Sequence, residues 1–123
     1  MHSRKELGNE GERITQRLVI SRWKMKVLET NFRSRLGEID LIARDGTDLV
    51  FMEVKTRMES EAGLPEDSIT PTKQDRIQKT ALFYLISHGL NPEETTFRFD
   101  VVSITFPLND PYHPQIRYYK YAF

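Results

Sequence analysis

Apolar residues near the start of the chain recur at helical spacing. Polar residues fill the positions between them, and the apolar ones within residues 5–21 are Leu7, Ile14, Leu18 and Val19. Such a stripe buries one side of a helix and leaves the other side in water. The pattern predicts an amphipathic helix over residues 5–21.

The next third of the chain is rich in β-branched and aromatic residues and is predicted to form strands. Residues 25–33 read as one strand, and residues 38–44 and 49–56 read as two more. Between the last two lie Asp45, Gly46, Thr47 and Asp48, which are typical turn residues. We therefore expect a β-hairpin over residues 38–56.

The remaining chain alternates a loop, a helix and two strands. Residues 57–70 contain Glu, Ser, Gly and Pro and predict an exposed loop. A second helix is expected to start at Thr70-Pro71 or at Thr72 and to end near His88-Gly89. Residues 97–106 and 116–121 then predict two strands. The order αβββαββ, without a shift in composition, favours one domain over residues 1–123, of the α/β class, with a mixed central sheet flanked by helices.

Alternation along the hairpin separates its residues into two faces. If the turn closes symmetrically, positions that sum to 93 lie opposite one another, so that Asp40 faces Glu53 and Glu38 faces Lys55. One expected face holds Ile39, Leu41, Ala43, Val50, Met52 and Val54, and the other holds Glu38, Asp40, Ile42, Phe51, Glu53 and Lys55.

The opposed carboxylates of Asp40 and Glu53 are a candidate metal site. Like charges directly opposite on a sheet are destabilising. A divalent cation such as Mg²⁺, which prefers oxygen ligands, would relieve that repulsion. Lys55 shares the face and could stabilise charge on a phosphate or orient an attacking water. The alternative is a solvated outer face, with Glu38 and Lys55 forming a surface pair worth under about 1 kcal/mol.

Composition and charge narrow the class of protein. The chain has no cysteine, which excludes thiolate chemistry and fits the reducing cytoplasm, and no stretch is apolar enough for a membrane span or a secretion signal. Net charge is zero, but residues 1–35 carry nine Lys and Arg against four Asp and Glu, whereas residues 36–70 carry three against nine. A basic segment beside an acidic centre suits a polyanion bound over a cation site, although charge runs are more often solvated faces.

The hairpin residues also carry a family resemblance. Asp40, followed thirteen residues later by Glu53-Val54-Lys55, resembles the PD-(D/E)xK nuclease superfamily, with Ile39 in place of the usual proline. A wider set of residues is similar to the YraN-like uncharacterised protein family. This set comprises Gly8, Gly11-Glu12, residues 37–42, residues 51–57, Lys73, residues 98–101 and Ala122-Phe123.

The resemblance implies a restriction-endonuclease-like fold and phosphodiester hydrolysis that depends on Mg²⁺ or Mn²⁺, with archaeal Holliday junction resolvases as similar relatives. By position, Asp40 and Glu53 would be metal ligands and Lys55 the catalytic lysine. Glu12 matches an additional acid on the first helix of those resolvases, although it could equally be a solvated glutamate. The expected substrate is DNA, with branched or junction DNA as the favoured form. Cleavage of both strands of a junction would need a homodimer.

Four basic residues are candidate nucleic-acid contacts. Arg13 and Arg17 belong to the basic first segment, Arg57 follows Lys55 on the same strand, and Lys73 lies in the first turn of the second helix. A solvated side chain is the competing interpretation for Arg57.

Other residues are expected to be structural. Gly8 and Gly11 suggest a close approach of the first helix to another backbone or to phosphate, with fraying as the alternative. Arg98 and Asp100 are expected to form a structural pair. The tyrosines of residues 118–121 could stack on bases, but packing within a half-buried strand explains them more simply.

Two rival functions remain open beside the metal-dependent endonuclease. One is a nucleic-acid-binding protein of the same fold with little or no catalysis, and the other is a protein-interaction module that uses the basic helix. The presence of Asp40, Glu53 and Lys55 together favours the enzyme.

Overall fold

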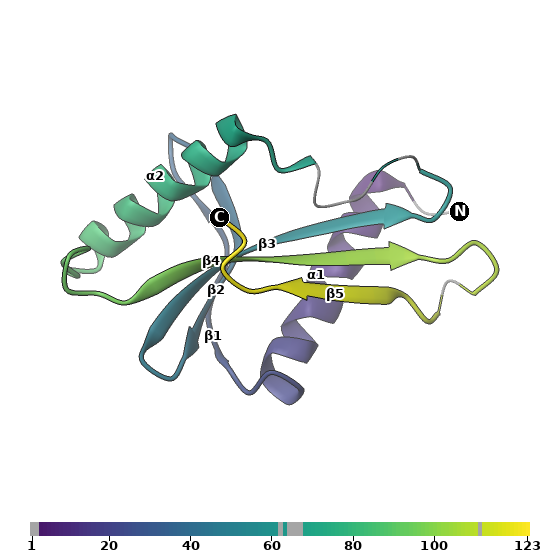
Figure 1. Cartoon of the computed structure of the whole chain (residues 1–123), viewed down its shortest axis with the longest axis horizontal. Coiled ribbons are helices and arrows are strands. Elements are labelled where there is room, and N and C mark those ends of the chain that lie inside the picture. Colours follow the sequence, from purple (N-terminus) through teal and green to yellow (C-terminus); the bar gives the residue numbers. More distant parts are fainter. Residues whose placement is uncertain (1–2, 62, 64–67, 111) are drawn as a thin grey trace.

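The computed structural model describes residues 3–61, 63, 68–110 and 112–123, and it confirms the predicted order of elements in them. The elements are α1 (Arg4–Ser21), β1 (Lys26–Arg33), β2 (Glu38–Asp45), β3 (Asp48–Met58), α2 (Pro71–Ser87), β4 (Phe97–Phe106) and β5 (Gln115–Tyr119). Their strands form one mixed sheet in the order β1-β2-β3-β4-β5, in which β3 and β4 run parallel and the other neighbours run antiparallel. Helix α1 lies behind the sheet and α2 lies in front of its left part (Figure 1).

Both helices begin at a capping side chain. The Ser3 hydroxyl accepts a hydrogen bond from the Glu6 N–H, and the Thr70 hydroxyl accepts one from the Lys73 N–H. Each cap satisfies one of the backbone donors that a helix start leaves unpaired. Pro71 follows Thr70 as the first helical residue, which decides between the two predicted starts in favour of Thr70-Pro71.

Strand β3 extends further than predicted. The sequence pattern places residues 57–58 in the loop, but Arg57 pairs with Thr105 and Met58 pairs with Phe106 of β4. The parallel partner therefore prolongs the strand beyond the end of the apolar pattern. Of the remaining predicted loop, residues 62 and 64–67 lie outside the described residues. Strand β5 ends at Tyr119, two residues earlier than predicted.

The turn of the β2–β3 hairpin is shorter than predicted. Asp45 and Asp48 pair with each other and leave a two-residue turn, in which Gly46 has a φ of 61°. The predicted register is confirmed near this turn, since Leu41 pairs with Met52 and the pairs up to the turn follow the same rule. Arg98 of β4 bonds both aspartates and thereby holds them within the strands.

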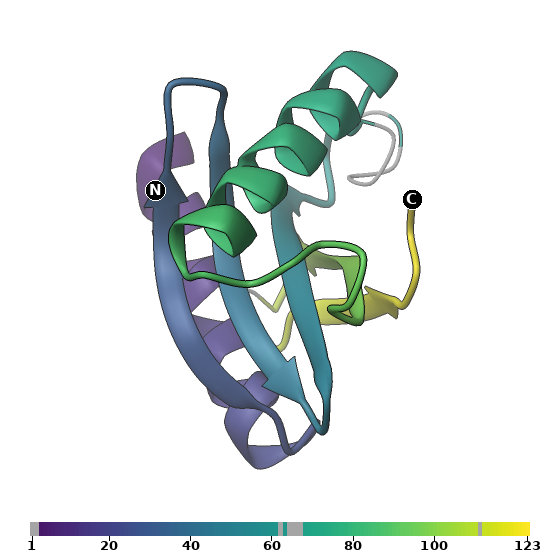
Figure 2. The same cartoon turned by 90° about the vertical axis from the view of Figure 1, so that its left-hand side faces the viewer.

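The sheet has one apolar core on each face. Figure 2 shows α1 and α2 on the two opposite sides of the sheet. The α1 side contains Leu7, Val19, Leu41, Ala43, Val50, Met52, Val102, Ile104 and Phe106. The α2 side contains Ile39, Ile42, Leu49, Phe51, Ile77, Ala81, Tyr84, Leu85 and Phe99. The prediction that Ile39 shares a face with Leu41 is therefore wrong, because the alternation of faces is interrupted at Asp40.

Helix α1 crosses the sheet closely at Gly11. A Cβ built on Gly11 would lie 1.9 Å from Cγ2 and 3.3 Å from Cβ of Thr56, whereas a Cβ on Gly8 would meet nothing within 4 Å. The predicted close approach is confirmed for Gly11 against β3, but at Gly8 the structure gives no such contact.

This difference gives a matched pair of variants. Gly11→Ala is expected to destabilise the protein by about 1–3 kcal/mol, because the added methyl overpacks the contact between helix and strand. Gly8→Ala is expected to stabilise it by about 0.5–1 kcal/mol through helix propensity alone. Urea unfolding followed by circular dichroism measures both. Equal responses of the two variants would contradict the close approach.

Candidate functional site

The β2–β3 hairpin splits open at Asp40. The pairing of the two strands ends at Leu41 and Met52, and the next backbone donor, the Val54 N–H, bonds the Asp40 carboxylate at 2.8 Å instead of a backbone carbonyl. Beyond this point β3 continues beside β4 while β2 stays beside β1, so that the two halves of the hairpin diverge (Figure 1). We call this place the strand split.

One predicted pairing is lost because of the split. The predicted register places Glu38 opposite Lys55, but Glu38 pairs with Arg33 of β1 at 3.5 Å. Lys55 pairs instead with Glu53, two residues before it on its own strand, at 3.5 Å between Nζ and Oε1. The surface pair of Glu38 and Lys55 that the solvated-face interpretation requires is therefore absent.

Three carboxyl groups converge at the strand split. Burial, followed by the charge of Asp40 and a hydrogen bond with it, raises the pKa of Glu53 to about 8. The same causes in the same order raise the pKa of Glu12, on α1, to about 7. The hairpin register predicts the pair of Asp40 and Glu53, whereas Glu12 is predicted from the family resemblance alone. The structure brings all three together.

Glu12 reaches the strand split because of its neighbour in the sequence. Gly11 has no side chain, so α1 can approach β3 closely at Thr56. Glu12 is the next residue along the helix and is half-buried against the side where Asp40 lies. The close approach at Gly11 thus places the Glu12 side chain near Asp40.

The carboxyl groups of Asp40 and Glu53 are suitable ligands for a hard divalent cation. Mg²⁺ takes oxygen ligands, often only one or two carboxylates, and fills its other positions with water and phosphate oxygens. In the part of the chain that the structure describes, no group of three or more His, Cys, Asp or Glu side chains is arranged so that it could hold a metal ion by itself. Asp40 and Glu53 fit an open site that shares its cation with a substrate. A cation would offset the repulsion by Asp40, which after burial is the next cause of the raised pKa of Glu53.

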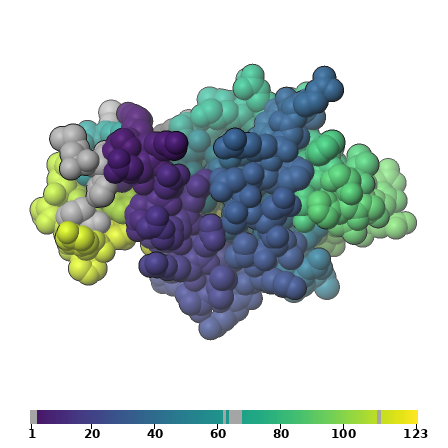
Figure 3. Space-filling model, turned by 180° about the vertical axis from the view of Figure 1, so that it is seen from behind, coloured from purple at the N-terminus to yellow at the C-terminus, as the bar shows by residue number. Residues whose placement is uncertain are grey.

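The four predicted nucleic-acid contacts lie in three different places. Arg13 and Arg17 are exposed and lie two positions from the buried residues of α1, so they point away from the sheet. Helix α1, drawn purple, lies on the face of the molecule that Figure 3 shows. Lys73 is exposed in the first turn of α2. Only Arg57 belongs to the same strand face as Glu53 and Lys55, and its Nε and Nη1 atoms are buried with no hydrogen-bond partner among the described residues.

The structure contains a basic hollow that the sequence does not predict. It has a volume of about 530 Å³ and lies between the β1–β2 hairpin and α2, lined by Ser34, Arg35, Leu36, Gly37, Asp75, Arg76 and Lys79. Lys79 pairs with Asp75 at 2.8 Å. The hairpin and the helix that line it are far apart in the sequence, so no local motif could have indicated it.

A buried ionic network fastens β4 to the hairpin turn. The Arg98 guanidinium is 2% exposed and donates to Asp45 at 2.8 Å, to Asp48 at 3.0 Å and to Asp100 at 3.0 Å. Asp100 is fully buried and also accepts hydrogen bonds from the Tyr118 hydroxyl and the Tyr121 N–H. The predicted structural pair of Arg98 and Asp100 is confirmed.

The element order, the mixed sheet with a helix on each face, and the acids and lysine at the strand split define a restriction-endonuclease-like α/β fold. The chain belongs to the uncharacterised protein family UPF0102, whose family model matches residues 11–104.

Relatives in this family match between about two thirds and nearly all of the chain. A UPF0102 protein of Geobacter sulfurreducens is 40% identical over 122 residues, which are 99% of this chain and 91% of that protein. One of Geobacter metallireducens is 43% identical over 119 residues, which are 97% and 93% of the two chains. One of Lachnoclostridium phytofermentans is 53% identical over 77 residues, or 63% and 64%. Neither helix of the described residues is long and apolar enough to cross a membrane.

Proposed function

We propose that the protein is a metal-dependent endonuclease that hydrolyses phosphodiester bonds in DNA and prefers branched or junction DNA. The observation that carries the proposal is the convergence of Asp40, Glu53 and Glu12 at the strand split, with Lys55 on the same strand as Glu53. A solvated hairpin face would not bring acids from three separate elements into contact.

Each residue at the strand split has a role in this proposal. Asp40 and Glu53 hold Mg²⁺ or Mn²⁺, which supplies Lewis-acid chemistry to the phosphodiester when bound. The Lys55 ammonium, with its side chain 22% exposed, donates to a phosphate oxygen and stabilises the charge that develops there. Glu12, at the mouth of the site, accepts a hydrogen bond from the attacking water and so orients it.

Basic groups support a polyanionic substrate. Arg35 and Arg76 line the basic hollow, and Arg57 extends the row of Glu53 and Lys55. Phosphate contacts by such groups position the backbone without reading its sequence. Cleavage of both strands of a junction would need two active sites, and the proposal therefore includes a homodimer on such substrates.

A cleavage panel tests the proposal. Single-stranded, duplex, flap and four-way DNA would be incubated with the protein and Mg²⁺ or Mn²⁺, with EDTA and Asp40→Asn as controls. We expect metal-dependent cutting that is fastest on branched DNA and is lost in both controls. Binding without cutting of any substrate would overturn the nuclease and favour the binding protein of the same fold.

Removing the charge of Asp40 should separate metal binding from folding. In Asp40→Asn the amide oxygen can still accept the Val54 N–H, while the carboxylate ligand is lost. Metal at about 100 times its dissociation constant should stabilise the wild type by roughly 2.7 kcal/mol, and the variant should lose most of that gain. Thermal unfolding across a Mn²⁺ titration measures both, with the exposed-loop variant Asp110→Asn as the control. An identical response of wild type and Asp40→Asn would exclude Asp40 as a ligand.

The metal-free protein should also show a pH dependence of known sign. The folded-state pKa of Glu53, about 8, lies above its ordinary value of 4.5, so the folded state keeps a proton that the unfolded chain releases. The free energy of unfolding in EDTA should therefore fall as pH rises from about 4.5 to about 8. Asp40→Asn should flatten this slope without abolishing it, because burial, the largest cause, remains. A slope of opposite sign would contradict the buried acid pair.

A further inference from the structure

Helix α2 packs against only part of its side of the sheet. The apolar contacts of α2 end at Phe51 of β3 and Phe99 of β4, and the right-hand parts of β3, β4 and β5 extend beyond the helix (Figure 1). Val102, Ile104 and Tyr118 pack on the α1 side, so their neighbours along the strands face the other way. The polar side chains on this side are those of Lys55, Arg57, Thr105, Arg117 and Tyr119, with Ser103 buried between them at 3% exposed, and we call this set the polar half-face.

The polar half-face is continuous with the strand split. Glu53 pairs with Val101 of β4, and Val101 pairs with Tyr119 of β5. Two strand spacings, roughly 10 Å, therefore separate Glu53 from Tyr119 along this row. The next row, from Lys55 through Ser103 to Arg117, carries a cation at each end.

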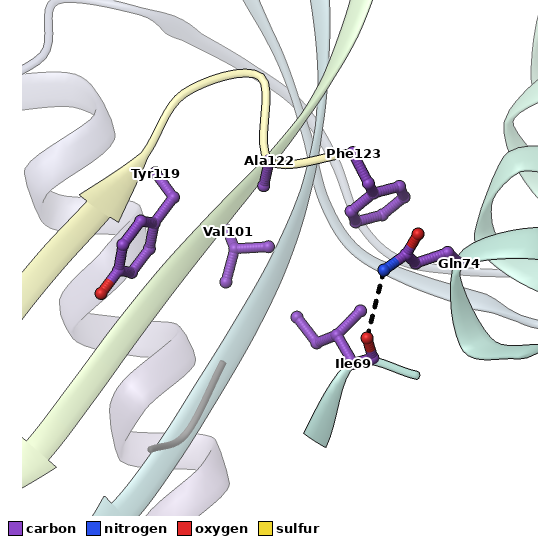
Figure 4. A pocket seen from close by; sticks show the side chains of 6 residues that line it. All are labelled: Ile69, Gln74, Val101, Tyr119, Ala122 and Phe123. Carbon is purple, nitrogen blue, oxygen red and sulfur yellow. Dashed lines mark hydrogen bonds between the residues drawn. The ribbon is translucent and has the colours of Figure 1, made fainter. Parts of the chain in front are cut away.

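An aromatic hollow lies at the β5 end of the first row. It has a volume of about 240 Å³ and is lined by Ile69, Gln74, Val101, Tyr119, Ala122 and Phe123. In Figure 4 the rings of Tyr119 and Phe123 lie on two sides of this hollow, with Val101 at its floor and the Gln74 carboxamide at its edge. Phe123 is held in place by stacking on Phe99, at 5.2 Å between ring centroids and 17° between planes.

The size and chemistry of this hollow fit a small planar ligand. Sites for drug-sized molecules measure about 300–1,000 Å³, so the hollow is too small for a larger ligand. Aromatic side chains beside a basic track are the usual means of holding single-stranded nucleic acid, because every base has a face that can stack. The Gln74 carboxamide at the rim donates from Nε2 to the Ile69 carbonyl at 3.2 Å, and its oxygen can accept a hydrogen bond from the edge of a base.

We infer that the hollow binds one unpaired nucleobase of the substrate strand, whose phosphates pass over Lys55, Arg57 and Arg117. The buried Nε and Nη1 atoms of Arg57 have no partner among the described residues, and a phosphate oxygen would supply one. This inference rests on the proposed nuclease function and deepens it, because it defines the substrate.

The inferred substrate has a single-stranded segment beside the scissile phosphate. A strand advances about 3.4 Å per nucleotide in a duplex and further when it is unstacked, so the bound base belongs to a nucleotide at most about three positions from the phosphate at Glu53. A fully paired duplex could place a base in the hollow only by unstacking it, which costs free energy. Flaps, junctions with open centres and single strands avoid that cost.

An abasic scan combined with a protein variant tests the inference. Flap oligonucleotides with one abasic site at successive positions would be titrated in EDTA by fluorescence anisotropy against wild type, Tyr119→Ala and Tyr119→Phe. One abasic position should weaken wild-type binding about tenfold. Tyr119→Ala should weaken binding of the intact flap by a similar factor. In this variant, the abasic site at that position should cause no further loss of affinity. Tyr119→Phe, which keeps the ring, should keep the loss at that one abasic position. Tyr112→Ala, whose side chain is 88% exposed in a separate loop, should behave as wild type.

Other outcomes would overturn the inference. A flat abasic scan on the wild-type protein would exclude a bound base whether or not Tyr119→Ala folds. If the fold-loss of affinity for Tyr119→Ala with the abasic flap equals the product of the two single losses, Tyr119 and that base act independently. Metal-dependent cleavage with a flat scan would leave the nuclease standing without the base site. An abasic position that weakens binding, in a protein that cleaves no substrate, would support the base site and exclude the nuclease.

Discussion

Lys55→Ala should abolish DNA cleavage while leaving metal binding intact. The ammonium lies beside Glu53 and faces the position of the phosphate in the proposed site, so its loss removes a charge that acts mainly on the transition state. Removing one such donor lowers turnover by about 10²- to 10³-fold. Lysine carries no lone pair for a divalent cation when protonated, so the metal-induced rise in melting temperature should persist.

The measurement is single-turnover cleavage at saturating protein, beside thermal unfolding with Mn²⁺. Lys5→Ala, on the exposed first turn of α1, serves as the control for loss of a positive charge and should cleave as the wild type does. Wild-type turnover in Lys55→Ala would remove this lysine from the mechanism. Loss of metal-induced stabilisation would instead assign it a role in shaping the cation site.

Arg98→Met should destabilise the folded protein severely, by about 3–5 kcal/mol. The guanidinium is buried and bonds three carboxylates, one of which, Asp100, is fully buried. Removing the cation leaves an uncompensated buried charge, and such losses are of this size. The stability should be measured by urea unfolding, with Arg44→Met on the exposed side of β2 as the control, for which a change within about 0.5 kcal/mol is expected.

A second variant separates the charge from the packing. Arg98→Met combined with Asp100→Asn should recover part of the loss, because the two residues share one network and their effects should not add. A cost below about 1 kcal/mol for Arg98→Met alone would show that water reaches Asp100 and that the network contributes little.

The hairpin could be predicted from the sequence because its information is local. Apolar positions set the register, and the confirmed pairs from Leu41 with Met52 to the turn follow from it. The split at Asp40 could not be predicted in this way. The split depends on the Asp40 carboxylate, which accepts the hydrogen bond of the Val54 N–H in place of a backbone carbonyl. The alternation of apolar and polar residues does not indicate this replacement.

Contacts between distant parts of the chain account for the other errors. The turn shortens because Arg98 bonds Asp45 and Asp48, and β3 lengthens because β4 pairs with it as far as Phe106. By contrast, the local sequence pattern indicates the polar half-face. Ser103 and Thr105 alternate with apolar residues along the strand of residues 97–106, and that alternation marks a face with a polar environment.

The placement of Asp40 and Lys55 on one hairpin also has a consequence for the order of folding. These residues lie within 16 positions of each other, whereas the parallel pairing of β3 with β4 joins residues 48 apart, such as Leu49 and Phe97. Closing the longer loop costs more entropy, and non-local pairing slows folding. The hairpin can thus form on the microsecond scale and present its acidic residues before the rest of the sheet docks. Repulsion between those acids then works against the early hairpin, so divalent cations that neutralise it would speed folding as well as stabilise the folded protein.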